Sequence, residues 1–195
     1  MTNTKFVAKH ALILFLIAFL CSLILILCNN LTKDRIAKLQ EQTELAAQSE
    51  VLPEAKTFEK ANEAMLISDG TVREVLAGKD ADGKEAGYCV KVEPSGFGGT
   101  ISMTVGIGND FTVKGVKITS MSETPGLGAK ADENWLKQFN GKKDGIEVVK
   151  TGNASDSQIN AISGATITSK AVTGGVNSAL SAAKIVSKAR ADKNE

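Results

Sequence analysis

The chain has 195 residues, and 23 Lys and Arg against 22 Asp and Glu give it a formal net charge of +1. The near-neutral charge, without a long basic run, argues against a nucleic-acid partner, and an aromatic content of 5% argues against a platform for stacked bases. Cys89 is the only cysteine beyond residue 30 and His10 is the only histidine, which excludes an internal disulfide or a four-ligand Cys and His zinc site in the rest of the chain.

An uncharged apolar segment at residues 11–28 reads ALILFLIAFLCSLILILC, in which only Ser22 is not apolar. This segment is long enough to span the ~30 Å hydrocarbon core of a bilayer. It is also longer than the apolar region of a typical signal peptide, and no small-x-small cleavage site follows it. We therefore predict that residues 1–30 form an N-terminal tail and an uncleaved transmembrane anchor.

The charges around this segment do not decide its orientation in a membrane. Lys5 and Lys9 precede the segment, whereas Lys33, Arg35 and Lys38 follow it together with acidic residues. The positive-inside rule therefore favours neither orientation. An assignment of the soluble part to one side of the membrane has to come from another observation.

Residues 31–53 predict a stalk helix that continues from the anchor. The stretch contains no Gly, helix-forming residues dominate it, and Pro53 marks its end. Its apolar residues make only a partial stripe, which is typical of a solvated or partner-facing helix. The remaining residues, 54–195, are enough for one hydrophobic core, and we expect a single domain there.

The middle of this domain predicts strands. Residues 101–107 alternate strictly, and the turn signal that follows them predicts an antiparallel hairpin. Further strands are expected at 65–67, 72–76, 88–92, 111–118 and 146–149, and helices at 131–139 and 168–191. The side chains expected in the core are Ile101, Met103, Val105, Ile107, Phe111, Val113, Val116, Ile118, Trp135, Phe139, Val172, Val176, Ala179, Leu180 and Ala183. This pattern predicts an α+β fold with a mainly antiparallel sheet and flanking helices.

Side chains suited to catalysis are scarce. His10 lies beside the membrane segment, so neither a Ser–His nor a Cys–His pair can form elsewhere in the chain. The GxxxxGK[ST] phosphate loop and the GxGxxG dinucleotide motif are both absent, and no spacing marks a pair of carboxylates. The sequence therefore predicts no catalytic residue and no metal ligand of its own.

Two stretches rich in small and turn-forming residues stand out instead. The first, residues 122–129, reads SETPGLGA, in which a Pro-Gly pair forces a turn and Gly128 permits close approach of another group. The second, residues 160–169, reads NAISGATITS and leads into the last helix. Free N–H groups and the helix dipole at such a place favour a phosphate. Capping of the helix by one of the hydroxyls is the alternative.

These two stretches resemble the covalent FMN-binding domain family. Residues 163–169, SGATITS, resemble its SGATxTS attachment motif, and residues 123–128 resemble its ETPGLG loop. The order of features also matches, with an anchor helix, a stalk and a glycine-rich SGFGG at 95–99 ahead of the two motifs. Within that family the chain resembles the G subunits of Rnf ion-translocating ferredoxin:NAD oxidoreductases over nearly its whole length.

The resemblance implies a site residue by residue. Thr166 matches the threonine that carries FMN through a phosphoester. The other cofactor-binding residues that it implies are Ser163, Gly164, Ala165, Thr168, Ser169, Glu123, Thr124, Gly126, Leu127, Gly128 and Gly98. Because a threonine hydroxyl is a poor nucleophile without a neighbouring base, a separate flavin transferase is expected to form the bond.

One position departs from the family's motif. The family usually has an Asp three residues before the Ser of SGAT, and this chain has Asn160 there. That Asp is associated with recognition by the flavin transferase. Asn keeps the size and one acceptor oxygen of Asp but loses the charge, and the attachment hydroxyl itself is unaffected.

Three further features have two interpretations each. Gly174 and Gly175 lie inside the predicted last helix, where each costs roughly 1 kcal/mol relative to Ala, and either a close approach by neighbouring backbone or the flavin, or chance, explains them. Glu123 is a loop carboxylate that either approaches the flavin ring or is solvated. Trp135 is expected in the core rather than stacked on a cofactor.

The resemblance implies an electron-transfer protein within a membrane complex that moves sodium ions or protons. Its soluble domain would lie on the extracytoplasmic side, beside other Rnf subunits, with the flavin supplying redox chemistry and the protein supplying position and electrostatics. The alternatives are a component like the C subunit of sodium-translocating NADH:quinone reductase and a non-catalytic membrane-anchored flavin sensor. A third alternative is a structural subunit whose hydroxyls only cap a helix.

Overall fold

The computed structural model describes residues 4–61, 69–143, 145–150, 152 and 154–193. By its internal contacts the chain forms two compact units, one up to Thr43 and one from Glu44 onward. The strand expected at 65–67 lies outside the described residues. The unit up to Thr43 holds most of one long helix, and the unit from Glu44 holds the α+β domain.

The long helix α1 spans Thr4–Val51 without a break and ends two residues before Pro53. It is the one helix among the described residues that is long and apolar enough to cross a membrane. Its apolar side chains are exposed in the first unit, as the side chains of a helix in lipid would be. Ser22 donates its hydroxyl hydrogen to the carbonyl of Ala18 at 2.8 Å, so this polar group is satisfied within the helix.

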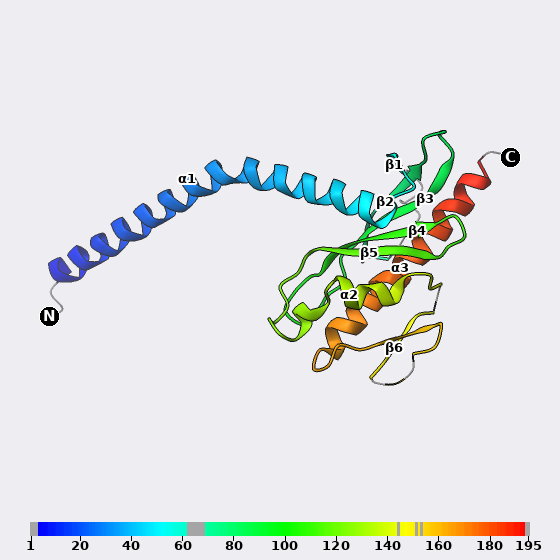
Figure 1. The fold of residues 1–195 in the computed structure, drawn as a ribbon. Coiled ribbons are helices and arrows are strands. Elements are labelled where there is room, and N and C mark those ends of the chain that lie inside the picture. Colours follow the sequence, from blue (N-terminus) through cyan, green and yellow to red (C-terminus); the bar gives the residue numbers. More distant parts are fainter. Residues whose placement is uncertain (1–3, 62–68, 144, 151, 153, 194–195) are drawn as a thin grey trace. The chain divides into compact units, whose positions relative to one another are not determined.

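The domain from Glu44 onward contains a five-stranded sheet with neighbouring helices (Figure 1). Its strands are β1 (Thr57–Lys60), β2 (Val72–Lys79), β3 (Glu85–Val92), β4 (Ser102–Gly108), β5 (Val113–Ser120), β6 (Glu147–Val149) and β7 (Gln158–Asn160). Its helices are η2 (Gly128–Lys130), α2 (Glu133–Leu136), η3 (Lys137–Phe139) and α3 (Thr166–Ala191). The first five strands pair in sequence order and are all antiparallel, whereas β6 and β7 form a separate parallel pair. The predicted α+β class is confirmed.

The main core lies between the five-stranded sheet and α3. Alternate residues of β3 and β4 face α3, as the period of two along a strand requires. The expected face of Ile101, Met103, Val105 and Ile107 is confirmed, since each is at most 2% exposed. The side chains that α3 buries against this face include Val172, Val176, Ala179, Leu180 and Ala183.

The opposite face of the sheet receives the last turns of α1. Gly106 on β4 and Gly115 on β5 lie so close to the backbone of Val51 that a side chain at either position would meet it. Val51 also packs with Leu76 and Cys89 in a second buried cluster. Glycines on this face therefore let the helix end approach the sheet closely.

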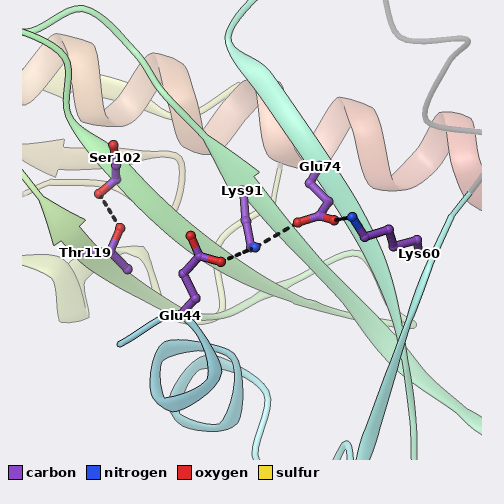
Figure 2. A network of polar contacts seen from close by, with 6 residues as sticks. All are labelled: Glu44, Lys60, Glu74, Lys91, Ser102 and Thr119. Atoms are coloured by element: carbon purple, nitrogen blue, oxygen red, sulfur yellow. Dashed lines mark hydrogen bonds and ion pairs between the residues drawn. The ribbon is translucent and has the colours of Figure 1, made fainter. Parts of the chain in front are cut away.

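Charged side chains tie the same helix end to the sheet, as Figure 2 shows. Lys91 on β3 pairs with Glu44 of α1 at 2.6 Å and with Glu74 of β2 at 2.8 Å. Lys60 of β1 joins the same Glu74 at 2.7 Å. Burial acts to lower the pKa of Lys91, but its two carboxylate partners raise that pKa overall. The network therefore holds Lys91 charged at the centre of the face.

Three details of the prediction differ from the structure. Phe111 was expected in a strand, but it lies in the turn before β5 with φ of 56°, and its N–H donates to the carbonyl of Gly108. The helix expected over 131–139 is a short α2 followed by the 3-10 helix η3. Strands β1 and β7 were not predicted, because neither short strand carries an alternation of apolar residues.

The two adjacent glycines of α3 are predicted to respond oppositely to alanine. A Cβ at buried Gly175 would meet Met103 and Pro94, whereas one at exposed Gly174 would meet nothing within 4 Å. We expect Gly174→Ala to raise the free energy of unfolding by roughly 1 kcal/mol and Gly175→Ala to lower it by about 1–3 kcal/mol. Thermal unfolding of the full chain in detergent, followed by circular dichroism, measures both. Shifts of the same sign would contradict this explanation of Gly175.

Candidate functional site

A buried carboxylate joins the three segments that the sequence singled out. Glu123 is 8% exposed, and its Oε1 accepts hydrogen bonds from the backbone N–H groups of Phe97 at 2.9 Å and Gly98 at 3.0 Å. Its Oε2 accepts a hydrogen bond from the Thr168 hydroxyl at 2.7 Å. One side chain therefore connects the glycine-rich turn, the ETPGLG loop and the first turn of α3. Because Glu123 is buried and hydrogen-bonded, the interpretation of Glu123 as a solvated loop carboxylate is wrong.

The glycine-rich turn is shaped around this carboxylate. The N–H of Gly96 donates to the carbonyl of Gly99 at 2.7 Å and closes a tight turn. The two successive N–H groups of Phe97 and Gly98 then point to the same oxygen of Glu123, an arrangement that binds anions well. A side chain at Gly96 would overlap the carboxylate, which explains why a glycine stands there.

The ETPGLG loop folds into two consecutive turns. The carbonyl of Thr124 accepts from the N–H groups of Leu127 at 3.1 Å and Ala129 at 3.3 Å. Gly126 adopts φ of 79°, a conformation that side chains disfavour. Gly128 is buried, and a Cβ there would overlap both the carboxylate and the hydroxyl bonded to it. The predicted close approach at Gly128 is confirmed, and the groups that approach it are the side chains of Glu123 and Thr168.

The SGAT segment leads into α3 without a side-chain cap. Gly164 adopts φ of 76° and reverses the chain, and Ala165 occupies the N-cap position with no side-chain hydrogen bond. The first N–H of the helix that bonds back along it is that of Ser169, which donates to the carbonyl of Ala165 at 3.0 Å. The alternative in which a hydroxyl caps this helix is therefore wrong. The backbone N–H groups of residues 166–168 therefore have no backbone acceptor among the described residues, and they lie at the positive end of the helix dipole.

Apolar packing holds the ETPGLG and SGAT segments together. Ala131, which follows the first loop, forms a buried cluster with Ile162 and Ala165. A Cβ at Gly164 would lie 3.0 Å from Cδ2 of Leu127. The two motifs, which are far apart in the sequence, therefore share one side of the domain.

The predicted site residues divide into an exposed set and a buried set. Thr166 is half-buried, and its hydroxyl makes no hydrogen bond to the part of the chain that the structure describes. The exposed residues around it are Ser163, Gly164, Thr124, Gly126, Leu127 and Gly98, and the buried ones are Ala165, Thr168, Ser169, Glu123 and Gly128. The Ser169 hydroxyl is fully engaged, since it accepts from the N–H of Ile162 and donates to the carbonyl of Ala165.

Asn160 lies on β7 just before SGAT and has a fully bonded backbone. Its N–H donates to Oε1 of Gln138 at 2.9 Å, and its carbonyl accepts from Nε1 of Trp135 at 2.8 Å. Its Oδ1 is buried and has no hydrogen-bond partner among the described residues. Trp135 also packs edge-on against Phe139 at 5.5 Å between ring centroids and lies partly buried against the core.

The residues at the start of α3 fit a phosphate ester of FMN. Thr166 is half-buried, and the N–H groups of Thr166, Ile167 and Thr168 precede the first hydrogen bond of the helix. Such N–H groups and the dipole favour a negatively charged group. Sequence reasoning missed two exposed apolar side chains, Ile167 next to Thr166 and Phe97 in the glycine-rich turn, although the glycines that flank Phe97 were a signal that only this side chain of the turn projects outward.

The buried titratable groups of the sheet take no part in this site. Burial raises the pKa of the Cys89 thiol to about 12, and Cys89 lies in the second buried cluster on the far face of the sheet. Burial and Glu85 raise the pKa of Tyr88 to about 12 as well. Both side chains therefore stay uncharged near neutral pH. In the described ranges, no group of three or more His, Cys, Asp or Glu is placed to hold a metal ion.

Comparison with known families matches both parts of the chain. Residues 96–181 match the model of the FMN-binding domain, and residues 1–51 match that of the RnfG N-terminal region. The first of these covers the glycine-rich turn from Gly96, the ETPGLG loop and the SGAT segment. All three segments joined by Glu123 therefore fall within a domain that binds FMN.

Two solved structures share the fold. The C subunit of the Na(+)-translocating NADH-quinone reductase from Parabacteroides distasonis is 22% identical with a TM-score of 0.58, over 77% of this chain and 95% of that one. NqrC of Shewanella oneidensis is 24% identical with a TM-score of 0.52, over 71% and 70%. Because both identities are below 25%, these structures show only that the fold is shared. They do not show that this chain is a component of a quinone reductase.

Two relatives resemble the chain over nearly its full length. The G subunit of the Na(+)-translocating ferredoxin:NAD(+) oxidoreductase complex of Acetobacterium woodii is 40% identical, over 94% of this chain and 95% of the relative. The G subunit of the ion-translocating oxidoreductase complex of Methanosarcina acetivorans is 32% identical, over 92% and 96%. The chain therefore belongs to the family of G subunits of ion-translocating (Rnf) oxidoreductase complexes and carries that family's FMN-binding domain.

Proposed function

We propose that this chain is the membrane-anchored electron-transfer subunit of an Rnf complex and carries FMN through a phosphoester to Thr166. The observation that carries the attachment is that Thr166, which is half-buried and whose hydroxyl makes no hydrogen bond to the described residues, lies at the uncapped start of α3 inside the SGATITS motif. FMN, when bound, takes up and releases electrons in turn, which no side chain near this site can do by itself.

The residues around Thr166 have separate tasks in this proposal. The N–H groups of the first turn of α3 hold the phosphate, and Gly164 keeps the approach to it free of a side chain. Leu127, which is 45% exposed beside Gly164, supplies an apolar contact for the flavin. The buried hydroxyls of Thr168 and Ser169 fix the backbone from within rather than contact the flavin directly.

The family and the long helix support the following proposal for the surroundings of the flavin domain. Residues 1–30 anchor the protein in the membrane by one helix, residues 31–53 form the stalk, and residues 54–195 form the flavin domain on the extracytoplasmic side. The partners are the other subunits of the Rnf complex and, for maturation, a flavin transferase. We infer the transferase because His10, the single histidine of the sequence, lies in α1, and the Thr166 hydroxyl is hydrogen-bonded to no base among the described residues.

Retention of flavin after denaturation tests the proposal. The full chain is produced in membranes together with a flavin transferase, purified in detergent, denatured in dodecyl sulfate and separated on a gel. We expect a flavin-fluorescent band at the mass of the chain. A chain that loses all flavin on denaturation would overturn the covalent attachment, whereas ferredoxin:NAD activity that persists in membranes whose copy of this chain is flavin-free would overturn the electron-transfer role.

A further inference from the structure

Phe97 presents an apolar ring to solvent at the tip of the glycine-rich turn. It is 71% exposed, more than any other large apolar side chain described from Glu44 onward. The other large apolar side chains exposed in that unit are Leu45, Leu127, Ile167 and Ile185. An exposed phenylalanine forgoes a favourable burial of apolar surface, so its presence at this position calls for a reason.

The ring is held outward by a rigid turn. The N–H groups of Phe97 and Gly98 are both bound to Glu123, and the N–H of Gly96 closes the turn on Gly99. Side chains at Gly96 and Gly98 would overlap Glu123 and the backbone that precedes it. The backbone is therefore packed against the protein on both sides of Phe97. Its ring is the one large side chain that the turn projects.

Two other exposed apolar side chains share this side of the domain. Ile167, 56% exposed, follows Thr166 directly, and Leu127, 45% exposed, lies against Gly164. Phe97 is linked to them through a single carboxylate, because Glu123 binds both the Phe97 N–H and the Thr168 hydroxyl. Three of the five exposed large apolar side chains of the unit therefore lie on the three segments that Glu123 joins, one on each segment.

We propose that Phe97 lies against the isoalloxazine ring of FMN tethered at Thr166, with Leu127 and Ile167 as its apolar neighbours. This inference rests on the proposed attachment. A flat, largely apolar heteroaromatic ring matches an exposed phenyl group, and aromatic pairs gain stability from offset or edge-on contact. A ring tethered on the same chain also meets Phe97 at a high effective concentration, which a separate partner does not.

Access of iodide to the flavin tests this contact. Full-length protein carrying flavin is kept folded in detergent, and quenching of flavin fluorescence by iodide is measured for wild type, Phe97→Ala and Phe97→Tyr. We expect the quenching constant to rise at least about twofold in Phe97→Ala and to stay near that of wild type in Phe97→Tyr. Ile185→Ala, which removes an exposed apolar side chain elsewhere on α3, is the matched control and is expected to change nothing.

The outcomes separate this contact from the attachment itself. Flavin bound to Thr166 in all variants, with the same quenching constant in Phe97→Ala as in wild type, overturns the contact and leaves the attachment intact. A wild-type chain without flavin at Thr166 overturns both. If Phe97→Ala leaves quenching unchanged but lowers the amount of the chain that co-purifies with the other subunits, the ring belongs to an interface and the inference is wrong.

Discussion

Replacing Thr166 with alanine is expected to abolish flavin fluorescence of the denatured chain, because alanine has no oxygen that can form the phosphoester. The substitution should leave the fold intact. The Thr166 hydroxyl makes no hydrogen bond to the described part of the chain, and alanine is a better helix former than threonine, by up to ~0.7 kcal/mol. Unchanged or slightly higher thermal stability of the flavin-free protein is therefore expected together with complete loss of the attached flavin.

Three matched variants make this result specific. Thr166→Ser keeps an oxygen at the same position and is expected to retain labelling. Ser163→Ala changes an exposed residue of the same motif and should leave the flavin attached. Thr168→Ala removes the hydroxyl that Glu123 binds and is expected to reduce labelling without abolishing it. A fluorescent band that persists in Thr166→Ala, or disappears only in Thr168→Ala, would contradict the assignment.

Replacing Glu123 with alanine is expected to lower the free energy of unfolding by about 2–4 kcal/mol, since hydrogen bonds to a charged group are among the stronger ones and three are lost together. The N–H groups of Phe97 and Gly98 and the Thr168 hydroxyl would all lose their acceptor. Glu123→Gln keeps one oxygen for the two N–H groups, and the hydroxyl can turn to accept from the new amide. We expect that variant to lose about 1 kcal/mol.

Hydrogen exchange locates the effect of Glu123 in the structure. In the full chain in detergent, peptides covering residues 95–100 should exchange faster in Glu123→Ala and close to the wild-type rate in Glu123→Gln. Glu54→Ala, at an exposed glutamate, is the matched control and should change neither exchange nor the melting temperature. Wild-type exchange at the glycine-rich turn in Glu123→Ala would show that the carboxylate does not hold the turn.

Much of the fold could be predicted because it depends on local patterns. The alternation of Ile101 to Ile107 and the spacing of apolar residues along α3 correspond to one buried face each. Strand β1 carries no such pattern, since its side chains are mostly exposed and its pairing with β2 relies on backbone hydrogen bonds at the sheet edge. Phe111 was misplaced because its left-handed conformation is unusual for a residue with a side chain.

The sequence motifs could predict which segments form the site, but not how these segments lie relative to one another. The motifs marked the ETPGLG and SGAT stretches, yet the role of Glu123 depends on a turn about 25 residues before it and a helix 45 residues after it. No pattern in the sequence shows that these three segments meet. The glycines at 96, 98 and 128 were visible, but what approaches each of them is defined only by the folded chain.

The central claim, that Thr166 carries FMN, is tested most directly by mass spectrometry of this protein isolated from its native membrane. The account predicts an intact mass higher than that of the sequence by one FMN less one water, with the added mass on the peptide that contains Thr166. An unmodified mass, or an added flavin located on Thr168 or on any other residue, would contradict it.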